Sequence, residues 1–559
     1  MNINASITRS LEKENSSFHE ESRCDLCRPG LAVRRGIWTT YADLPKATQG
    51  GIPVFYDGEN ILLVPYSHTL VTGSTGTGKS EVIYKNQLKL LGNLPSEIRP
   101  SFLVTDLKGD ISEMQAEYLR ALGYRVLIFD MRNPYRSARY NFLLQIYDDY
   151  QEAHAIDKAL KANEIGKEFD GEEFSSVRAA KDAAYCKKLS LLDDVERSIT
   201  ELAHIMIPVD DPKDRMWIVG ARTMLKAIIY TMLRDSEFPD HGMTREKFTI
   251  ANVCRASYST RDDCDDLVTW LRQAEDILCV KNAIAANYKI SAKVTRDGYI
   301  STLNTSLGDY TSHSIASLTA TSDEINLREV ASSRDPYAIF VITDDRQKAT
   351  NGICMLLINN LINELIAAAD RSPAHSLARD FIILADEFAN MPELPNISGK
   401  ITTLRSRRIW MMMAIQSVQQ LRMVYGPDVA EIIGDNCDLH LFIGCNNDET
   451  KAKFAASMGQ RLGVKTSFNL QNDNSVSVSK GTENVPVIRK SDLDILELGQ
   501  FYIRSRQTQN MLSEMVPFFR QSHEAEPRLA PSRVRRFDPN DNVFDIYEVA
   551  KKLENDSFW

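Results

Sequence analysis

Short apolar runs alternate with amphipathic stretches in the first third of the chain. Residues 69–72, 101–105 and 125–129 are apolar and rich in β-branched side chains, which predicts buried strands. Residues 81–91 and 111–122, between these runs, carry apolar side chains at helical spacing. Strands that alternate with helices predict an α/β fold, with a parallel sheet covered by helices.

The middle of the chain changes to a helical pattern. Between about 148 and 295 we find helical periodicity and almost no strand pattern. Helices are expected over 176–206, 217–233, 244–253 and 264–285. This pattern predicts an all-helical insertion in the α/β fold.

Strand patterns return after the insertion. Strands are expected at 337–343, 381–385, 409–415, 438–444 and, as the last strand of the core, 501–504, with a helix over 352–369. Turn signals around short apolar runs in 36–68 predict small strands, and 472–480 predicts a hairpin or an exposed loop. The tail from about 522 is rich in Pro, Arg and Asp and is expected to be peripheral.

A glycine-rich loop follows the first strand of the α/β pattern. Its sequence, GSTGTGKS, fits the phosphate-loop pattern, and its position between a strand and a helix is the context that identifies such a loop. Glycines let successive backbone N–H groups approach a phosphate, and the helix N-terminus favours an anion. The residues expected to hold the phosphates are Gly73, Ser74, Thr75, Gly76, Thr77, Gly78, Lys79 and Ser80.

Two side chains of this loop have separate chemical roles. Lys79 supplies a mobile positive charge for the terminal phosphates, and the Ser80 hydroxyl is a ligand for magnesium. The loop therefore predicts a site for a nucleotide and Mg²⁺. The chain then divides into a polar N-terminal segment (1–35), a nucleotide-binding domain in two parts (36–147 and 296–520), the all-helical insertion (148–295) and a C-terminal tail (521–559).

Two carboxylates follow the apolar strand at 381–385. Ligands of open α/β sheets bind at the carboxyl ends of the strands, where Asp386 and Glu387 are expected. Asp386 is suited to the magnesium hydration shell, and Glu387 to orienting or deprotonating the attacking water. An acidic turn after a strand is the simpler interpretation, but the phosphate loop upstream favours the catalytic one.

Polar side chains near the next strand offer two more candidates. Gln416 ends the strand at 409–415 and is suited to sensing the γ-phosphate or the water, although it could simply cap the strand. Residues 400–408 contain Arg405 and Arg407, either of which could face the nucleotide of a neighbouring subunit. A solvated basic face is the alternative for this turn.

Composition sets limits on these interpretations. The 559 residues suggest three or four domains, and the net charge of −10 excludes a uniformly basic nucleic-acid binder but allows a local basic channel. Nine cysteines without a disulfide pattern indicate a cytosolic protein. Cys24 and Cys27, near His19, could form half a zinc site, but a reduced pair is favoured because no further ligands follow at suitable spacing. The pattern predicts neither a signal peptide nor a transmembrane helix.

The acidic strand end and its surroundings resemble a known family. The sequence from Asp386 to Asn390, the arginine turn, and residues 414–421 resemble the type IV secretion coupling proteins, the hexameric RecA-like ATPases of bacterial conjugation. Residues 105–110 match the family's Asp-x-Lys-Gly-acid motif, which implies that Asp106 lies at the nucleotide. Tyr140-Asn141-Phe142 and 432–437 match two further family stretches, although Phe142 replaces a proline. The likeness extends over roughly 55–520.

This resemblance implies a RecA-like P-loop NTPase core that forms a ring of six, with ATP at subunit interfaces. It implies that Arg405 acts on the neighbouring nucleotide, with Arg407 as second choice. It also implies that the helical insertion, the all-alpha domain of this family, meets the substrate. Family members usually have N-terminal membrane-spanning helices, and this sequence shows none. We therefore expect a cytoplasmic protein, attached to the inner face of the membrane through a partner protein or free in the cytosol.

The expected function is an ATP-driven motor that recruits a relaxase-bound DNA strand, or a protein, to a type IV secretion channel. A soluble DNA translocase of the FtsK/HerA kind is one alternative. A receptor whose nucleotide serves assembly with little hydrolysis is another. The sequence leaves open whether the cargo is single-stranded DNA, double-stranded DNA or protein.

Overall fold

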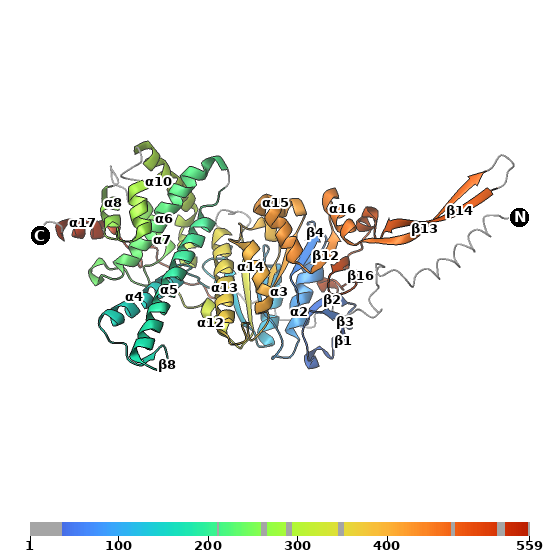
Figure 1. Ribbon diagram of the computed structural model, residues 1–559, viewed down its shortest axis with the longest axis horizontal. Coiled ribbons are helices and arrows are strands. Elements are labelled where there is room, and N and C mark those ends of the chain that lie inside the picture. The colour runs from blue at the N-terminus through green and yellow to red at the C-terminus, as the bar shows by residue number, and fades with distance from the viewer. Residues whose placement is uncertain are drawn as a thin grey trace.

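The protein is elongated, with a helical region, a central sheet and a projecting hairpin along its long axis (Figure 1). The computed structural model describes residues 36–209, 212–258, 265–286, 293–344, 351–470, 476–521 and 532–556. The predicted reduced pair Cys24 and Cys27 lies outside the described residues.

The central sheet has nine strands. Seven neighbouring strands, from β12 to β6, run parallel, and β15 and β16 join one edge in antiparallel orientation. Their spatial order is β16 (Met511–Glu514), β15 (Gln500–Ser505), β12 (Leu439–Gly444), β4 (Thr69–Gly73), β11 (Ile409–Ile415), β10 (Phe381–Ala385), β5 (Ser101–Thr105), β9 (Tyr337–Ile342) and β6 (Arg125–Asp130). The predicted, mostly parallel α/β sheet is confirmed. The strand at 501–504 is not the last of the core, because β16 pairs beyond it.

Alternate residues of each strand enter different hydrophobic clusters on the two faces of the sheet, as the two-residue period of a strand requires. In β10, Ile382 and Leu384 pack with α2 (Lys85–Gly92) and α3 (Asp110–Ala121). Phe381, Ile383 and Ala385 join the cluster that includes α13 (Asn351–Arg371), α14 (Ile397–Leu404) and α15 (Val418–Asn436). Burial on both faces explains why these strands read as continuous apolar runs.

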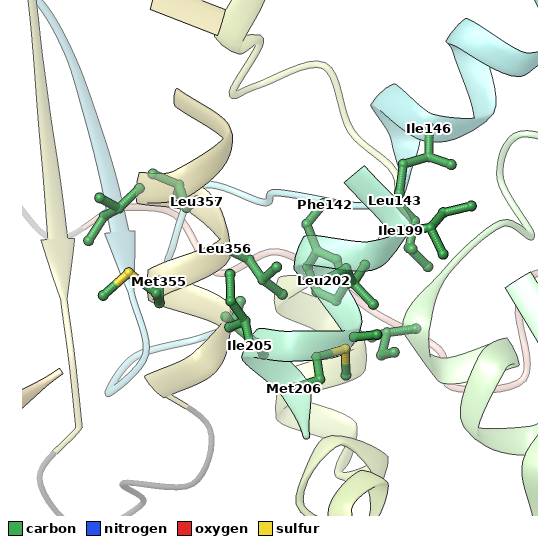
Figure 2. Packing of buried hydrophobic residues seen from close by; sticks show 14 of the residues in the cluster. Phe142, Leu143, Ile146, Ile199, Leu202, Ile205, Met206, Met355, Leu356 and Leu357 are labelled. Carbon is green, nitrogen blue, oxygen red and sulfur yellow. The ribbon is translucent and has the colours of Figure 1, made fainter. Parts of the chain in front are cut away.

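The helical region packs against α13 and shares its hydrophobic cluster. Figure 2 shows side chains of α13, α5 and the segment around Phe142 meeting in this cluster. Its helices are α4 (Leu144–Lys161), α5 (Val177–Met206), α6 (Arg215–Asp235), α7 (Ile250–Tyr258), α8 (Asp265–Arg272), α9 (Leu278–Ile284), α10 (Lys293–Gly308), α11 (His313–Leu318) and α12 (Leu327–Ser332). Because α10 packs against α6 and α7, the helical packing continues past 295. The domain boundaries at 147, 295 and 520 stay predictions.

Two of the four expected helices are confirmed by α5 and α6, and two differ. The helix expected over 244–253 begins only at Ile250, because a turn before it places Phe248 in the core. The helix expected over 264–285 is two helices, α8 and α9. Between them Gln273 turns its side-chain amide to the buried carboxylate of Asp235, which also accepts from the Trp270 indole.

The C-terminal tail is not peripheral, contrary to the sequence expectation. Helix α17 (Ile546–Asp556) packs on α8, and Phe544 lies near Trp270 in the main hydrophobic cluster. Ile546, Val549 and Ala550 are buried at helical spacing, so the short helix presents one apolar face to the core. The composition of the tail masked this amphipathic pattern.

Three small sheets complete the described part of the fold, and the smallest, β7 (Glu168–Phe169) with β8 (Glu172–Glu173), lies inside the insertion that was expected to be all-helical. The small strands predicted in 36–68 are β1 (Ile37–Thr40), β2 (Ile52–Tyr56) and β3 (Asn60–Val64), and they pair as an antiparallel sheet with β3 in the middle. Strands β13 (Gln460–Leu470) and β14 (Val476–Pro486) form a hairpin that projects from the body (Figure 1).

Among the described residues, α6 and α13 are long and apolar enough to cross a membrane, although the sequence predicted no such helix. Their most apolar 18-residue windows are 61% and 67% buried inside the fold. Helices in the core of a large protein are apolar on most sides, and they combine such length and hydropathy with burial inside the fold.

Candidate nucleotide site

The carboxyl ends of the parallel strands bring the predicted residues to one edge of the sheet. Ala385 of β10 pairs with Thr105 of β5, so the residues that follow, Asp386 and Asp106, leave adjacent strands. Ile415 of β11 pairs with Thr72 of β4, so Gln416 emerges beside the start of the phosphate loop. Strand β11 lies between β4 and β10 and sets the spacing of loop and carboxylates.

The phosphate loop has the backbone that its glycines predict. Gly76 and Gly78 have φ of 86° and 90°, the left-handed region that favours glycine. A Cβ at Gly73 would lie 2.8 Å from Thr77 Oγ1, so a side chain there would collide with the folded loop. Ser74 N donates to Gly444 O at the end of β12 (2.8 Å), which anchors the loop to its neighbouring strand.

Lys79 is folded over this loop at the start of a π-helical segment, η2 (Lys79–Tyr84). Its Nζ donates to Gly73 O (2.8 Å), and its side chain is almost completely buried, with 6% of the residue exposed. The ammonium group is therefore held in the concavity of the loop by neutral carbonyl oxygens. A phosphate oxygen is a stronger, charged acceptor for the same donor.

Ser80 and Asp386 form the link between the loop and the acidic strand end. Ser80 Oγ donates to Asp386 Oδ2 (3.1 Å), and Asp386 Oδ1 is buried without a hydrogen-bond partner among the described residues. Burial raises the pKa of Asp386 to about 6, against the lowering effect of Lys79 and Ser80. An orphan carboxylate oxygen beside a hydroxyl suits magnesium, which in nucleotide sites takes one or two protein oxygens plus phosphates and water.

Glu387 has an unusual backbone conformation. Its φ of 55° and ψ of 49° place it in the left-handed region, which is uncommon for a non-glycine residue and is found often at functional sites. Its carboxylate accepts a hydrogen bond from Asn390 Nδ2. This contact holds the Glu387 carboxylate within its own turn, and its role at the attacking water stays a prediction.

Asp106 lies at the same edge with both carboxylate oxygens occupied. Oδ1 accepts from Gly109 N (2.8 Å) and Oδ2 from Ser112 N (2.7 Å), so the carboxylate holds the start of α3. The residue is 1% exposed, and its charge contributes to the raised pKa of Asp386. Direct contact between Asp106 and nucleotide stays a prediction; its observed role is to build the loop beside Asp386.

Gln416 is half-buried beside the loop. Its backbone N–H donates to Gln420 Oε1 (3.3 Å), and its carbonyl accepts from Cys445 Sγ (3.1 Å), which holds the backbone where β11 ends. Gln416 therefore lies at the same sheet edge as the phosphate loop and Asp386, and its role at the γ-phosphate stays a prediction.

Arg405 is not brought to the phosphate loop of its own chain. It precedes β11 and so lies at the amino edge of the parallel sheet, opposite the loop. Its side chain is 56% exposed and its guanidinium pairs with Asp438 (2.8 Å), while Arg407 pairs with Asp370 (2.8 Å). Any action of Arg405 on a nucleotide therefore requires a second subunit, and that role stays a prediction.

The sequence interpretation missed an ion-pair cluster just after the loop. Lys85 is buried between Glu81 (2.5 Å) and Asp110 (3.1 Å), which ties the helix after the loop to α3. Glu81 and Lys85 are four residues apart on one helical face, so their pairing was visible in the sequence. The contact with Asp110 was not, because it depends on the tertiary fold.

The fold is similar to solved structures of the plasmid coupling protein TrwB. TrwB in complex with the non-hydrolysable ATP analogue ADPNP has a TM-score of 0.56 at 14% identity, covering 91% of this chain and 100% of that chain. TrwB in complex with ADP and Mg²⁺ has a TM-score of 0.53 at 14% identity, covering 93% and 99%. The trigonal form of TrwBdeltaN70 with sulphate gives 0.56 at 14%, covering 92% and 100%. At this identity the likeness shows a shared fold.

The sequence itself gives a family assignment. No curated protein matches it significantly. The family described as type IV secretory system conjugative DNA transfer matches residues 33–486, which is most of the chain. The protein therefore belongs to the type IV secretory system conjugative DNA transfer family.

Proposed function

We propose that the protein is an ATPase that drives conjugative DNA, carried with a relaxase or another protein, into a type IV secretion channel. The observation that carries this proposal is the convergence of Lys79, Ser80 and Asp386 at one edge of the sheet. The family assignment and the nucleotide complexes of the similar protein TrwB support the same conclusion.

The proposed chemistry assigns one task to each residue. The backbone amides of the loop and Lys79 bind the β- and γ-phosphates. Ser80 and Asp386 would hold Mg²⁺, which when bound neutralises phosphate charge and polarises the γ-phosphate. Glu387 accepts a proton from the attacking water, and Gln416 orients that water or senses the γ-phosphate.

We also propose that the chain works as a homo-hexamer with nucleotide at each subunit interface. The opposite placement of Arg405 and the phosphate loop supports this assembly, because each subunit then presents an arginine and a loop on different edges. In this proposal residues 36–147 and 296–520 form the motor, and the helical region receives the cargo. Attachment to the membrane occurs through a partner protein.

The deciding experiment compares Glu387→Gln with the wild type in steady-state ATP hydrolysis. General-base catalysis contributes about 10²–10⁴-fold, so the variant is expected to lose at least roughly 100-fold in turnover. Its affinity for ATP is expected to be unchanged, because the γ-phosphate is held by the loop. Glu431→Gln, at an exposed position of α15, is the matched control. Equal turnover in wild type and Glu387→Gln would overturn the assignment of the site.

A further inference from the structure

The C-terminal segment 532–536 runs alongside the loop 131–139, nearly 400 positions earlier in the sequence. Arg535 N donates to Tyr135 O (2.7 Å), and Ser532 Oγ donates to Arg136 O (2.5 Å). This pairing collects cations from distant parts of the chain into one surface, which we call the basic strip. The basic strip consists of Lys108, Arg132, Arg136, Arg139, Arg533, Arg535 and Arg536.

Several guanidinium groups of the basic strip donate to neutral acceptors. Arg136 Nη1 donates to Ser532 O (2.5 Å), and Arg139 Nη2 donates to Arg536 O (2.8 Å). Arg132 likewise donates to a backbone carbonyl. A carbonyl oxygen orients a guanidinium group but does not cancel its charge. The strip is therefore held in shape while its positive charge is retained.

Carboxylates compensate only a minority of these cations. Arg535 pairs with Glu324 (2.9 Å), and Arg132 approaches Asp130 at 3.8 Å. Within the described residues, no ion pair involves the exposed Arg533 and Arg536. Arg139 Nε is buried without a hydrogen-bond partner in the same part of the chain. The strip thus retains uncompensated positive charge, although the whole chain carries −10.

The basic strip lies at the same edge of the sheet as the nucleotide site. The loop 131–139 follows the carboxyl end of β6, and Arg132 packs over Gly109 in the turn after β5. A Cβ at Gly109 would lie 1.8 Å from Arg132 Nη2, so only glycine allows this approach. The same turn is fixed by Asp106, whose neighbour on the next strand is Asp386. A ligand on the strip would therefore lie beside the turn that borders the proposed nucleotide site.

We propose that the basic strip binds the sugar-phosphate backbone of single-stranded DNA. This inference rests on the proposed function and names the surface that holds the substrate. Arginines match the two oxygens of a phosphodiester in fork geometry, and several in a row bind without sequence preference. Tyr135, 41% exposed among these arginines, offers an aromatic plane on which a base can stack. A phospholipid headgroup has no aromatic base that could stack on this ring.

The test uses the full chain and a fluorescein-labelled oligothymidylate of about 20 nucleotides, a length that exceeds the site of one binding surface. Arg533→Gln/Arg536→Gln removes two exposed charges that no described ion pair uses. Arg178→Gln/Arg215→Gln removes two exposed charges from the helical region and is the matched control. Fluorescence anisotropy over a salt series gives Kd and its salt dependence for each protein.

The strip variant is expected to raise Kd on the order of tenfold at 0.1 M salt, with a slope against log salt smaller by about 1.4. The control variant and ATP turnover without DNA are expected to remain at wild-type values. Equal weakening by both variants, or by neither, overturns the inference. Wild-type protein that binds vesicles with anionic lipid but not DNA also overturns it, in favour of a membrane surface.

These outcomes are separable from failure of the proposed function. If the strip variant binds DNA normally while Glu387→Gln abolishes ATP turnover, the motor proposal stands and the strip proposal falls. If DNA binding depends on the strip but wild type and Glu387→Gln turn over ATP equally, the strip stands and the catalytic assignment falls.

Discussion

Ser80 Oγ lies 3.1 Å from Asp386 Oδ2 although 306 positions separate the two residues in the sequence. The contact joins the end of the phosphate loop to the end of β10 across β11. It leaves Asp386 Oδ1 buried and without a partner among the described residues. The hydroxyl and the carboxylate are thus close enough to bind the same cation. The contribution of each group to metal binding can be tested separately.

Ser80→Ala removes the hydroxyl and leaves the glycines and Lys79 in place. We expect Mg²⁺-dependent affinity for ATP to fall roughly tenfold or more, while affinity for ATP in EDTA stays nearly unchanged. Titration calorimetry with Mg²⁺ and with EDTA measures the metal-dependent and the metal-independent affinity for ATP. Ser457→Ala, at an exposed serine on α16 (Asp448–Ser457), is the control. An equal loss in EDTA would mean that the hydroxyl supports the loop and not the metal.

Asp386→Asn tests the cost of burying this carboxylate. Burial raises the pKa of Asp386 to about 6, so the folded protein binds its proton more tightly than the unfolded chain does. Stability from this group therefore increases as pH falls from 7 toward 4 and is lost as pH rises through 6. We expect the variant to be more stable than wild type at pH 7 by about 1–3 kcal/mol without ligand.

This difference in the free energy of unfolding should shrink as pH falls, because protonated Asp386 is neutral like asparagine. Urea unfolding of both proteins at pH 5 and pH 7 measures it. The variant should also lose Mg²⁺-dependent binding of ATP. A variant that is less stable than wild type at pH 7 would show that the charged carboxylate is stabilising, against the raised pKa.

Arg405→Ala is expected to lower ATP turnover by roughly 10³-fold, the contribution typical of an arginine supplied in trans, without changing ATP affinity. The reason is its position at the sheet edge opposite its own loop, where it pairs with Asp438 (2.8 Å). Arg407→Ala, which breaks the pair with Asp370, tests the second candidate of the same turn and is expected to keep the wild-type turnover. Mixing Arg405→Ala with Lys79→Ala protein should restore some turnover at mixed interfaces, and no recovery would contradict the trans role.

Lys400 and Glu201 connect the nucleotide core to the helical region. Lys400 on α14 is buried 3.7 Å from Glu201 on α5, and Asn359 and Asn363 of α13 both donate to Glu201 (2.7 Å). Glu201→Gln leaves a buried ammonium group uncompensated, which costs about 3 kcal/mol. A double-mutant cycle with Lys400→Met should give a coupling above about 1 kcal/mol. Glu196→Gln, exposed on the same helix, should change stability little.

The strands and the phosphate loop were predictable because their signals are local. The buried runs at 101–105, 381–385 and 409–415 are strands over those same residues, since parallel strands buried on both faces need continuous apolar sequence. The glycines at 76 and 78 have the positive φ that the loop pattern requires. The positions of Lys79, Ser80 and Asp386 were predictable because each residue lies in or directly follows one of these local elements.

Features that depend on distant contacts were not predictable. The sequence does not reveal that both carboxylate oxygens of Asp106 accept backbone N–H groups at the start of α3. Which N–H groups reach a carboxylate depends on the backbone conformation of the folded turn. The tail was expected to be peripheral, yet its short apolar face fits against Trp270, whose surroundings form only after folding. The positive φ of Glu387 was likewise invisible, since glutamate does not favour it.

The return of the C-terminus constrains how the protein can move. The chain crosses from the sheet to the helical region after β6 and returns to the sheet before β9. It crosses to the helical region a third time near its C-terminus, where 532–536 pair with the loop 131–139 and α17 packs on α8. Two parts of a protein that are joined by one chain segment can rotate about that segment. Three separate segments restrict rotation of one part against the other. In the motor that we propose, rotation of the helices against the sheet is therefore expected to be small, and cleavage of the third crossing is expected to enlarge it.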